Sequence, residues 1–102
     1  MHKFPTRCVH SGTLRDDMNR GINSPVYTST SYEFIGREET VYPRYLNTPN
    51  EKAVATKIAS LEETEAALVF SSGMAAISSV LFTILRSGDH ALFQRGLYGG
   101  TS

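Results

Sequence analysis

Residues 70–76, Phe-Ser-Ser-Gly-Met-Ala-Ala, constrain most strongly what this chain can fold into. An apolar run of strand length, residues 66–70, leads into them. Behind them, apolar residues recur at helical spacing: Ile77, Val80, Leu81, Ile84 and Leu85. The pattern predicts a tight turn from a strand into a helix. Ser71 or Ser72 would cap the helix, and Gly73 would let another group approach the backbone closely.

Such a turn is a candidate phosphate site, because the first N–H groups of a helix lack internal partners and lie at the positive end of its dipole. Taken alone the signal is weak, since many α/β proteins use a serine cap and a glycine merely to turn a corner. The stretch lacks the glycine patterns of dinucleotide and P-loop sites, which disfavours NAD and ATP. Neither Ser71 nor Ser72 lies in a G-x-S-x-G motif, so a serine hydrolase has little support.

A second strand is expected after the helix. Gly88 is placed to act as the C-terminal cap, and residues 90–93 form another apolar run. A strand, a helix and a strand make a βαβ unit with parallel strands and a right-handed crossover. Residues 98–102, Tyr-Gly-Gly-Thr-Ser, are typical of a loop that enters a further helix. The expected fold class is α/β.

The amino-terminal 47 residues show no sustained helical or alternating pattern, yet they are not polar. Long irregular segments inside compact domains are uncommon and usually serve a site or a partner, whereas a disordered tail would carry fewer aromatic residues. The apolar and aromatic residues of this segment are Val9, Ile22, Val26, Tyr27, Tyr32, Phe34, Ile35, Val41, Tyr42 and Tyr45. We therefore expect residues 1–47 to form an extended arm that packs on another subunit, and residues 48–102 to begin an α/β domain.

The end of this arm carries a second candidate phosphate contact. Pro43 favours an extended Tyr42, and residues two apart in an extended segment point the same way. Tyr42 and Arg44 would then present a phenol and a guanidinium on one face, a pair that suits a phosphate. For these residues in isolation, a solvated arginine beside a packing tyrosine is the simpler interpretation.

A helix should follow directly. Thr48 is a good N-cap, Pro49 suits the first helical position, and Glu51 completes a capping box. The helix carries a narrow apolar stripe of Val54, Ile58 and Leu61. Lys52 and Lys57 fall on other faces and are expected to be solvated.

Composition excludes several classes of function. Ten basic and ten acidic residues cancel without a basic cluster, which predicts no nucleic-acid partner. The first residues lack the apolar core of a signal peptide, and no apolar run is long enough to span a membrane. The single cysteine, Cys8, excludes an internal disulfide and fits a reducing compartment, so the cytoplasm is the expected location. His2, His10 and His90 have no metal-ligand spacing, so no metal site is expected.

The combination of motifs resembles the Cys/Met-metabolism family of pyridoxal-phosphate (PLP) enzymes. That family includes cystathionine γ-synthase, cystathionine β-lyase, cystathionine γ-lyase, methionine γ-lyase and the homoserine sulfhydrylases. The motifs are Tyr42-x-Arg44-x-x-Asn47, residues 71–76, Gly88-Asp89-His90 and residues 98–101, and residues 6–12 and 24–30 resemble the family's amino-terminal arm. The resemblance covers essentially all 102 residues.

The resemblance implies the fold-type I (aspartate-aminotransferase-like) large domain, PLP as the cofactor, and a homotetramer built as a dimer of dimers. Ser72, Gly73 and Met74 would bind the cofactor phosphate, the last two through backbone N–H groups. Tyr42 and Arg44 would reach the phosphate in the neighbouring subunit. Tyr98 would stack on the pyridine ring, with its hydroxyl near the reacting bonds, and is the expected catalytic residue.

Two positions depart from the family pattern. The family usually reads Asn-Pro-Thr where this chain has Asn47-Thr48-Pro49, which predicts a local shift because Thr48 still caps and Pro49 still starts the helix. Methionine γ-lyases commonly carry a cysteine at the position of Gly100, so the chain looks less like that branch.

The lysines bear on what the chain can do alone. Lys3, Lys52 and Lys57 all precede the phosphate turn, and none is in a plausible Schiff-base position. We therefore expect an amino-terminal fragment of a transsulfuration-type enzyme, a cystathionine β-lyase or cystathionine γ-synthase that cleaves or forms carbon–sulfur bonds in sulfur amino acids, inactive alone. The alternatives are a non-catalytic phosphate-binding or interaction α/β module and a nucleotide-binding α/β domain.

Overall fold

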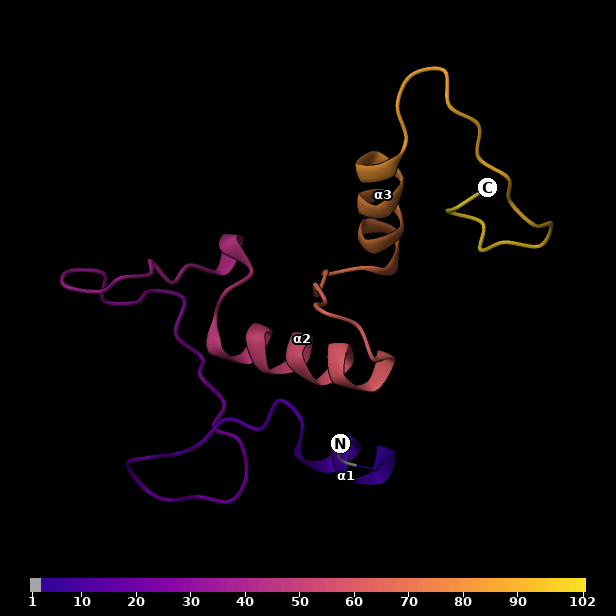
Figure 1. The fold of residues 1–102 in the computed structure, drawn as a ribbon. Helices are drawn as coiled ribbons and strands as arrows, with labels where there is room; N and C mark the ends of the chain where they lie inside the picture. Colours follow the sequence, from indigo (N-terminus) through magenta and orange to yellow (C-terminus); the bar gives the residue numbers. More distant parts are fainter. Residues whose placement is uncertain (1–2) are drawn as a thin grey trace. The chain divides into compact units, whose positions relative to one another are not determined.

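The computed structural model describes residues 3–102, which fall into two compact units divided between Val69 and Phe70. The elements are α1 (Phe4–His10), the short 3-10 helix η1 (Pro43–Tyr45), α2 (Pro49–Glu62) and α3 (Gly73–Ile84) (Figure 1). The first three belong to the first unit and α3 belongs to the second.

The predicted helix after Thr48 is confirmed as α2. The Thr48 backbone is extended, with φ −66° and ψ 154°, and Pro49 occupies the first turn. The Glu51 carboxylate accepts hydrogen bonds from the Thr48 backbone N–H at 3.2 Å and from its hydroxyl at 2.5 Å. At the other end Glu63 adopts the left-handed conformation, φ +56°, and stops the helix.

The helix α1 lies within the segment expected to be extended, so that expectation is wrong for Phe4–His10. A seven-residue helix is too short to persist alone, and α1 is held by α2. Its Arg7 guanidinium donates to the Ser60 carbonyl and to the Glu63 carboxylate, both at 2.7 Å. These partners lie 53 and 56 residues away in the chain, so no local pattern announces the helix.

The backbones of the two helices meet at the end of α1. The Lys57 ammonium donates to the Cys8 carbonyl at 3.0 Å, one of the carbonyls that a helix leaves without an internal partner. Gly12, at φ +69°, lies against α2 so closely that a Cβ there would overlap the Ala53 carbonyl oxygen. Lys57 is therefore engaged with the arm rather than merely solvated.

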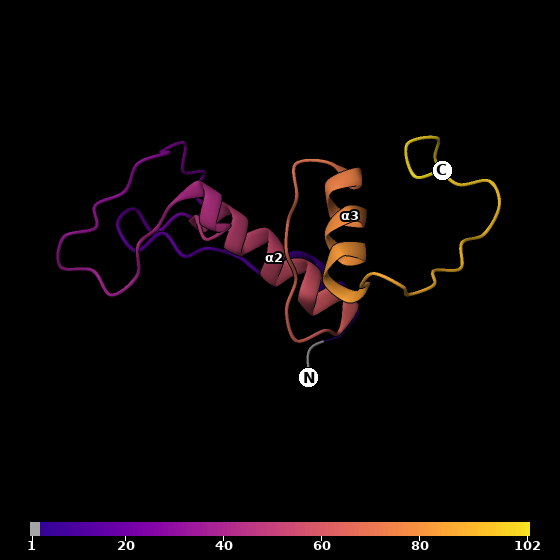
Figure 2. The ribbon, with the colours of Figure 1, turned by 90° about the horizontal axis from the view of Figure 1, so that it is seen from above.

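The rest of the arm is irregular and is attached to α2 at two further places. The Asn50 side-chain oxygen accepts from the Tyr27 N–H at 2.9 Å, and its amide donates to the Pro25 carbonyl at 3.3 Å. The second attachment is an ion pair between Glu39 and Lys52 of α2. The irregular loops extend past the amino-terminal end of α2 in both views (Figures 1 and 2). The first unit is thus an arm organised along one helix.

In the second unit, the predicted helix is confirmed as α3, with Ser72 as its N-cap. The helix ends at Ile84, and Leu85 is already extended at φ −95° and ψ 143°. Gly88, at φ +97°, is therefore not the cap but part of the turn that follows. In that turn the Arg86 N–H donates to the Asp89 carboxylate at 2.7 Å and the Asp89 N–H donates to the Arg86 carbonyl at 3.0 Å.

The two predicted strands are not formed. Residues 66–70 and 90–93 have no regular structure, and no strand occurs anywhere among residues 3–102. A strand exists only when its N–H and C=O groups pair with those of a neighbour, and neither run has such a neighbour. The α/β expectation is therefore not confirmed by the described residues, whose regular structure is helical throughout.

Little apolar surface is buried. In the described part of the chain, Ala59 is the one buried hydrophobic residue and Thr48 is the one buried polar residue. Large side chains of α3 remain in solvent, with Phe82 at 85% exposure and Ile84 at 64%. Of the helices in the described residues, none combines the length and apolar character that crossing a membrane requires.

Candidate functional site

The amino-terminal end of α3 is open for a ligand. The Ser72 hydroxyl accepts from the Ala75 N–H at 3.1 Å, and the Ser72 carbonyl accepts from the Ala76 N–H at 3.2 Å. The N–H groups of Gly73 and Met74 have no acceptor among the described residues. A Cβ built on Gly73 meets no atom within 4 Å, so the space beside Gly73 is open. The end of the helix therefore offers two unpaired donors and the positive end of a dipole.

The loop that carries Tyr98 lies beside this turn. The Thr101 hydroxyl is 3.4 Å from the Met74 sulfur, and the Thr101 N–H donates to the Tyr98 carbonyl at 2.8 Å. A Cβ added to Gly100 would lie 3.0 Å from the Tyr98 ring and 3.4 Å from the Met74 sulfur. Four predicted residues are thus gathered within the second unit: Ser72, Gly73, Met74 and Tyr98. The Tyr98 side chain is 75% exposed, which leaves a ring face available.

The geometry of Tyr42 and Arg44 differs in part from the prediction. Tyr42 is extended, at φ −152° and ψ 136°, as the following proline requires. Arg44, however, lies within η1, so the argument from alternation in an extended segment is wrong. The Tyr42 ring instead packs edge-on against Tyr45, with centroids 5.4 Å apart and an interplanar angle of 71°. Arg44 is exposed and forms none of the hydrogen bonds or ion pairs found in the described part of the chain.

Tyr42 and Arg44 belong to the first unit, and the four residues of the α3 turn and its neighbouring loop belong to the second. The predicted site residues therefore form two groups, one within each unit.

Sequence reasoning missed the residues that fasten the Tyr42 loop: Glu39 and Lys52, with Asn47 noted only as part of a motif. Glu39 and Lys52 are 13 positions apart and carry no local pattern that pairs them. Asn47 is the last residue of the Tyr-x-Arg-x-x-Asn motif and directly precedes the N-cap Thr48. Asparagine at such a junction often bonds the nearby backbone, and this was the one sequence signal for its role.

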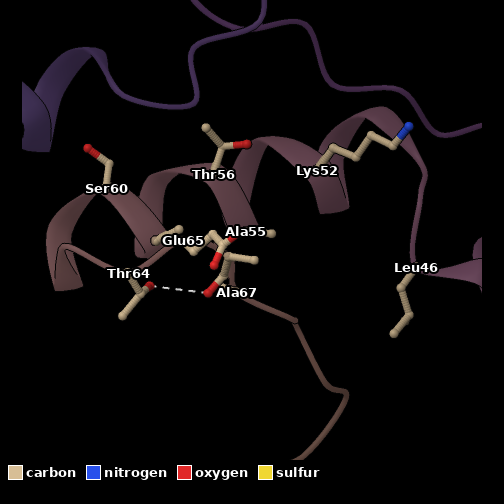
Figure 3. A pocket seen from close by; sticks show the side chains of 10 residues that line it. Leu46, Lys52, Ala55, Thr56, Ser60, Thr64, Glu65 and Ala67 are labelled. Carbon is tan, nitrogen blue, oxygen red and sulfur yellow. Dashed lines mark hydrogen bonds between the residues drawn. The ribbon is translucent and has the colours of Figure 1, made fainter.

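A separate hollow lies along α2 and the segment after it (Figure 3). Its walls are mostly small side chains, and it includes Lys52 and Glu65 but none of the predicted site residues. No group of three His, Cys, Asp or Glu residues in the described range could hold a metal ion.

Comparisons with known proteins agree with the motifs. A family model described as Cys/Met metabolism PLP-dependent enzyme matches residues 5–102. An L-methionine gamma-lyase of Fusobacterium nucleatum subsp. polymorphum is 37% identical over 107 residues, covering 94% of this chain and 27% of that protein. An O-acetyl-L-homoserine sulfhydrylase of Corynebacterium glutamicum is 36% identical over 109 residues, covering 96% of this chain and 25% of that protein.

A solved structure supports the same relationship. Apo CalE6, a methionine gamma lyase from Micromonospora echinospora, matches 85% of this chain and 23% of its own at a TM-score of 0.74 and 32% identity. The chain spans about a quarter of the length of the relatives it matches, 27% and 25% for the two named above. On the family match over nearly its whole length, the chain belongs to the Cys/Met-metabolism family of PLP-dependent enzymes.

Proposed function

We propose that residues 1–102 form the cofactor-holding amino-terminal part of a PLP enzyme that cleaves or forms carbon–sulfur bonds in sulfur amino acids. The observation that carries this proposal is the pair of N–H groups at Gly73 and Met74, which have no acceptor among the described residues, with the Tyr98 loop beside them. A phosphate fits the first feature and a flat aromatic ring fits the second. The family of the chain makes PLP the ligand that combines both.

Each residue then has a defined task. Gly73 and Met74 would donate backbone N–H groups to the phosphate, and Ser72 would hold the turn through its bond to the Ala75 N–H. Tyr98 would stack on the pyridine ring and hold or move a proton through its hydroxyl. When bound, PLP supplies an electron sink for the carbanion at the substrate α-carbon, so that a β or γ substituent can leave.

The arm of residues 1–47 is proposed to act between subunits. Tyr42 and Arg44 are both exposed and together offer a hydroxyl donor and a forked cation. We assign them to the phosphate in a neighbouring subunit of a homo-oligomer, a dimer of dimers, with residues 48–102 starting the cofactor domain.

The covalent anchor of the cofactor is proposed to come from outside these 102 residues. Lys52 is bound to Glu39, and Lys57 donates to the Cys8 carbonyl. Both lie in the first unit, away in sequence from the turn that would hold the phosphate. Residues 1–102 alone would therefore be inactive, and the complete enzyme would work in the cytoplasm on a sulfur-containing amino acid.

Among family reactions we favour a cystathionine β-lyase or cystathionine γ-synthase. The relatives do not separate these from methionine γ-lyase, because a probable cystathionine gamma-synthase of Herpetosiphon aurantiacus is 35% identical and the Fusobacterium lyase 37%. Gly100 favours the cystathionine enzymes, because methionine γ-lyases commonly carry a cysteine at the position that the resemblance aligns with Gly100.

The test uses the full-length protein that carries this sequence. Purified with PLP, it should show the visible absorbance of bound cofactor and should act on cystathionine or an activated homoserine faster than on methionine. Tyr98→Phe should mainly lower kcat, by about 10²–10⁴-fold, which is the range for a proton-transfer group. Stable binding of inorganic phosphate without PLP binding or turnover would instead support the non-catalytic module.

A further inference from the structure

Asn47 ties together the loop that presents Tyr42 and Arg44. Its side-chain oxygen accepts from the Tyr42 N–H at 2.9 Å, and its amide nitrogen donates to the Thr40 carbonyl at 2.9 Å. The same nitrogen donates to the Glu39 carboxylate at 3.0 Å. One side chain therefore bonds the backbone on both sides of residue 41, much as a neighbouring strand would.

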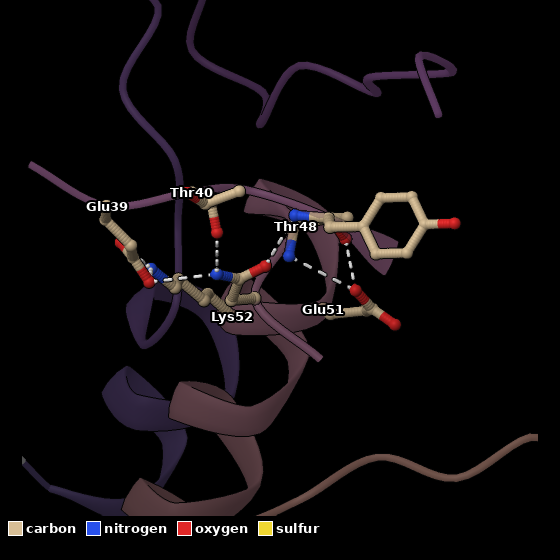
Figure 4. Close-up of polar contacts among 7 residues, drawn as sticks. Glu39, Thr40, Thr48, Glu51 and Lys52 are labelled. Atoms are coloured by element: carbon tan, nitrogen blue, oxygen red, sulfur yellow. Dashed lines mark hydrogen bonds and ion pairs between the residues drawn. The ribbon is translucent and has the colours of Figure 1, made fainter. Parts of the chain in front are cut away.

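Glu39 is itself fixed to the helix behind the loop. The Lys52 ammonium reaches both of its carboxylate oxygens, at 2.9 and 2.7 Å (Figure 4). The hydrogen bonds from Lys52 and Asn47 lower the pKa of the Glu39 carboxyl from its ordinary value. Since Lys52 lies in the first turn of α2, this pair fastens the start of the loop to a rigid element.

The far end of the loop is constrained as well. The Tyr45 N–H donates to the Tyr42 carbonyl at 2.9 Å, and the Leu46 N–H donates to the Pro43 carbonyl at 3.1 Å. Leu46 then adopts the left-handed conformation at φ +55°, which is unfavourable for a branched side chain. Such a conformation persists only where the surroundings impose it.

We propose that Asn47, with the Glu39–Lys52 pair, is a positioning residue that holds the Tyr42–Arg44 loop ready for a phosphate. This rests on the proposed function, because it takes Tyr42 and Arg44 as phosphate contacts. A loop that is already ordered loses less conformational entropy on binding, and a ligand's apparent affinity falls with the fraction of protein in the competent state. None of the three positioning side chains needs to touch the ligand.

The experiment measures equilibrium binding of PLP and of pyridoxal, which lacks the phosphate, to cofactor-free full-length protein. The variants are Asn47→Ala, Glu39→Gln, Arg44→Ala and the double variant Arg44→Ala/Asn47→Ala. Glu38→Gln is the matched control, because Glu38 forms none of the hydrogen bonds or ion pairs found in the described residues. Trypsin cleavage after Arg44 in the cofactor-free protein reports loop order independently of any ligand.

Asn47→Ala should raise the Kd for PLP by about tenfold, because the ordered state of the loop loses roughly the net free energy of one hydrogen bond. Pyridoxal binding and the Glu38→Gln control should not change, and Glu39→Gln should weaken PLP binding by about two- to threefold. Loop cleavage should accelerate in both positioning variants. Added to Arg44→Ala, Asn47→Ala should have much less effect than it has alone, because the loop then presents only Tyr42.

The outcomes separate the two proposals. An unchanged PLP affinity in Arg44→Ala would reject the phosphate assignment itself. The positioning role alone would be rejected if Arg44→Ala weakened PLP binding while Asn47→Ala left it unchanged. It would also be rejected if Asn47→Ala weakened the binding of PLP and of pyridoxal equally. If Asn47→Ala does not fold, Glu39→Gln decides the question by the same two readouts.

Discussion

At the scale of single residues, Gly12 carries the strictest requirement. Its φ of +69° is accessible chiefly to glycine, and a Cβ there would overlap the Ala53 carbonyl oxygen of α2. Gly36 has a similar φ of +76° but no atom within 4 Å of the same position. A side chain at Gly12 would therefore meet both backbone strain and steric overlap, whereas one at Gly36 would meet backbone strain alone.

We predict that Gly12→Ala destabilises the full-length protein by about 2–4 kcal/mol, combining left-handed strain with overpacking. Gly36→Ala should cost only the strain, about 1–2 kcal/mol. Urea denaturation followed by circular dichroism gives both values. Equal losses of stability in the two variants would mean that the overlap with the Ala53 carbonyl oxygen adds nothing to the backbone strain.

Ser72 is the second residue with a sharp prediction. Ser72→Ala removes the acceptor for the Ala75 N–H and should destabilise α3 by about 1 kcal/mol, whereas Ser72→Gly should cost a few tenths. Ser71→Ala is the control, because the capping bond belongs to Ser72 alone. Amide hydrogen exchange along α3 measures the difference, and equal protection in Ser71→Ala and Ser72→Ala would contradict the cap.

At the scale of elements, the sequence predicted those whose causes are local. The capping box of Thr48 and Glu51 and the serine before Gly73 set the starts of α2 and α3, and both begin where predicted. The helix α1 was missed because Arg7 finds its partners 53 and 56 residues away. Residues 66–70 and 90–93 have the composition of strands but no neighbour to pair with, so composition alone misled there.

The site divides in the same way. The turn residues Ser72, Gly73 and Met74 could be found from the sequence because the helix start is a local feature. The link from Glu39 to Lys52 could not, since it joins an irregular segment to a helix through one ion pair.

The attachment of the loop to α2 should depend on pH. Because Lys52 and Asn47 lower the pKa of Glu39 in the folded state, the carboxylate stabilises the fold above its unfolded pKa. That stabilisation is lost as the pH falls through the lowered folded value. Protection of the Tyr42 amide from hydrogen exchange, corrected for intrinsic rates, should decline over this acidic range in the wild type. In Glu39→Gln the protection of the Tyr42 amide should be lower than in the wild type and should not change with pH over the same acidic range.

At the scale of the whole molecule, the described residues bury too little apolar surface to be stable by themselves. Ala59 is the buried hydrophobic residue of the described part, while Met18, Ile22 and Leu92 are at least 90% exposed. Folded domains of this length ordinarily remove most of their apolar side chains from water. The missing cover is consistent with an arm and a domain portion that pack on other surfaces.

We therefore predict that residues 1–102 expressed alone bind the dye ANS and lack a cooperative thermal transition by calorimetry. The full-length protein should show the transition and bind little dye. A monodisperse 102-residue monomer that melts cooperatively would contradict this and would favour the independent module.

The dependence of α1 on α2 also fixes an order of events on the ribosome. Phe4–His10 is made early, but the Ser60 carbonyl that receives the Arg7 guanidinium is made 53 residues later. At synthesis rates of roughly 5–20 residues per second, that interval is about 3–10 s. A seven-residue helix is not stable without its packing partner, so Phe4–His10 emerges unfolded and becomes helical only after α2 has left the ribosomal tunnel.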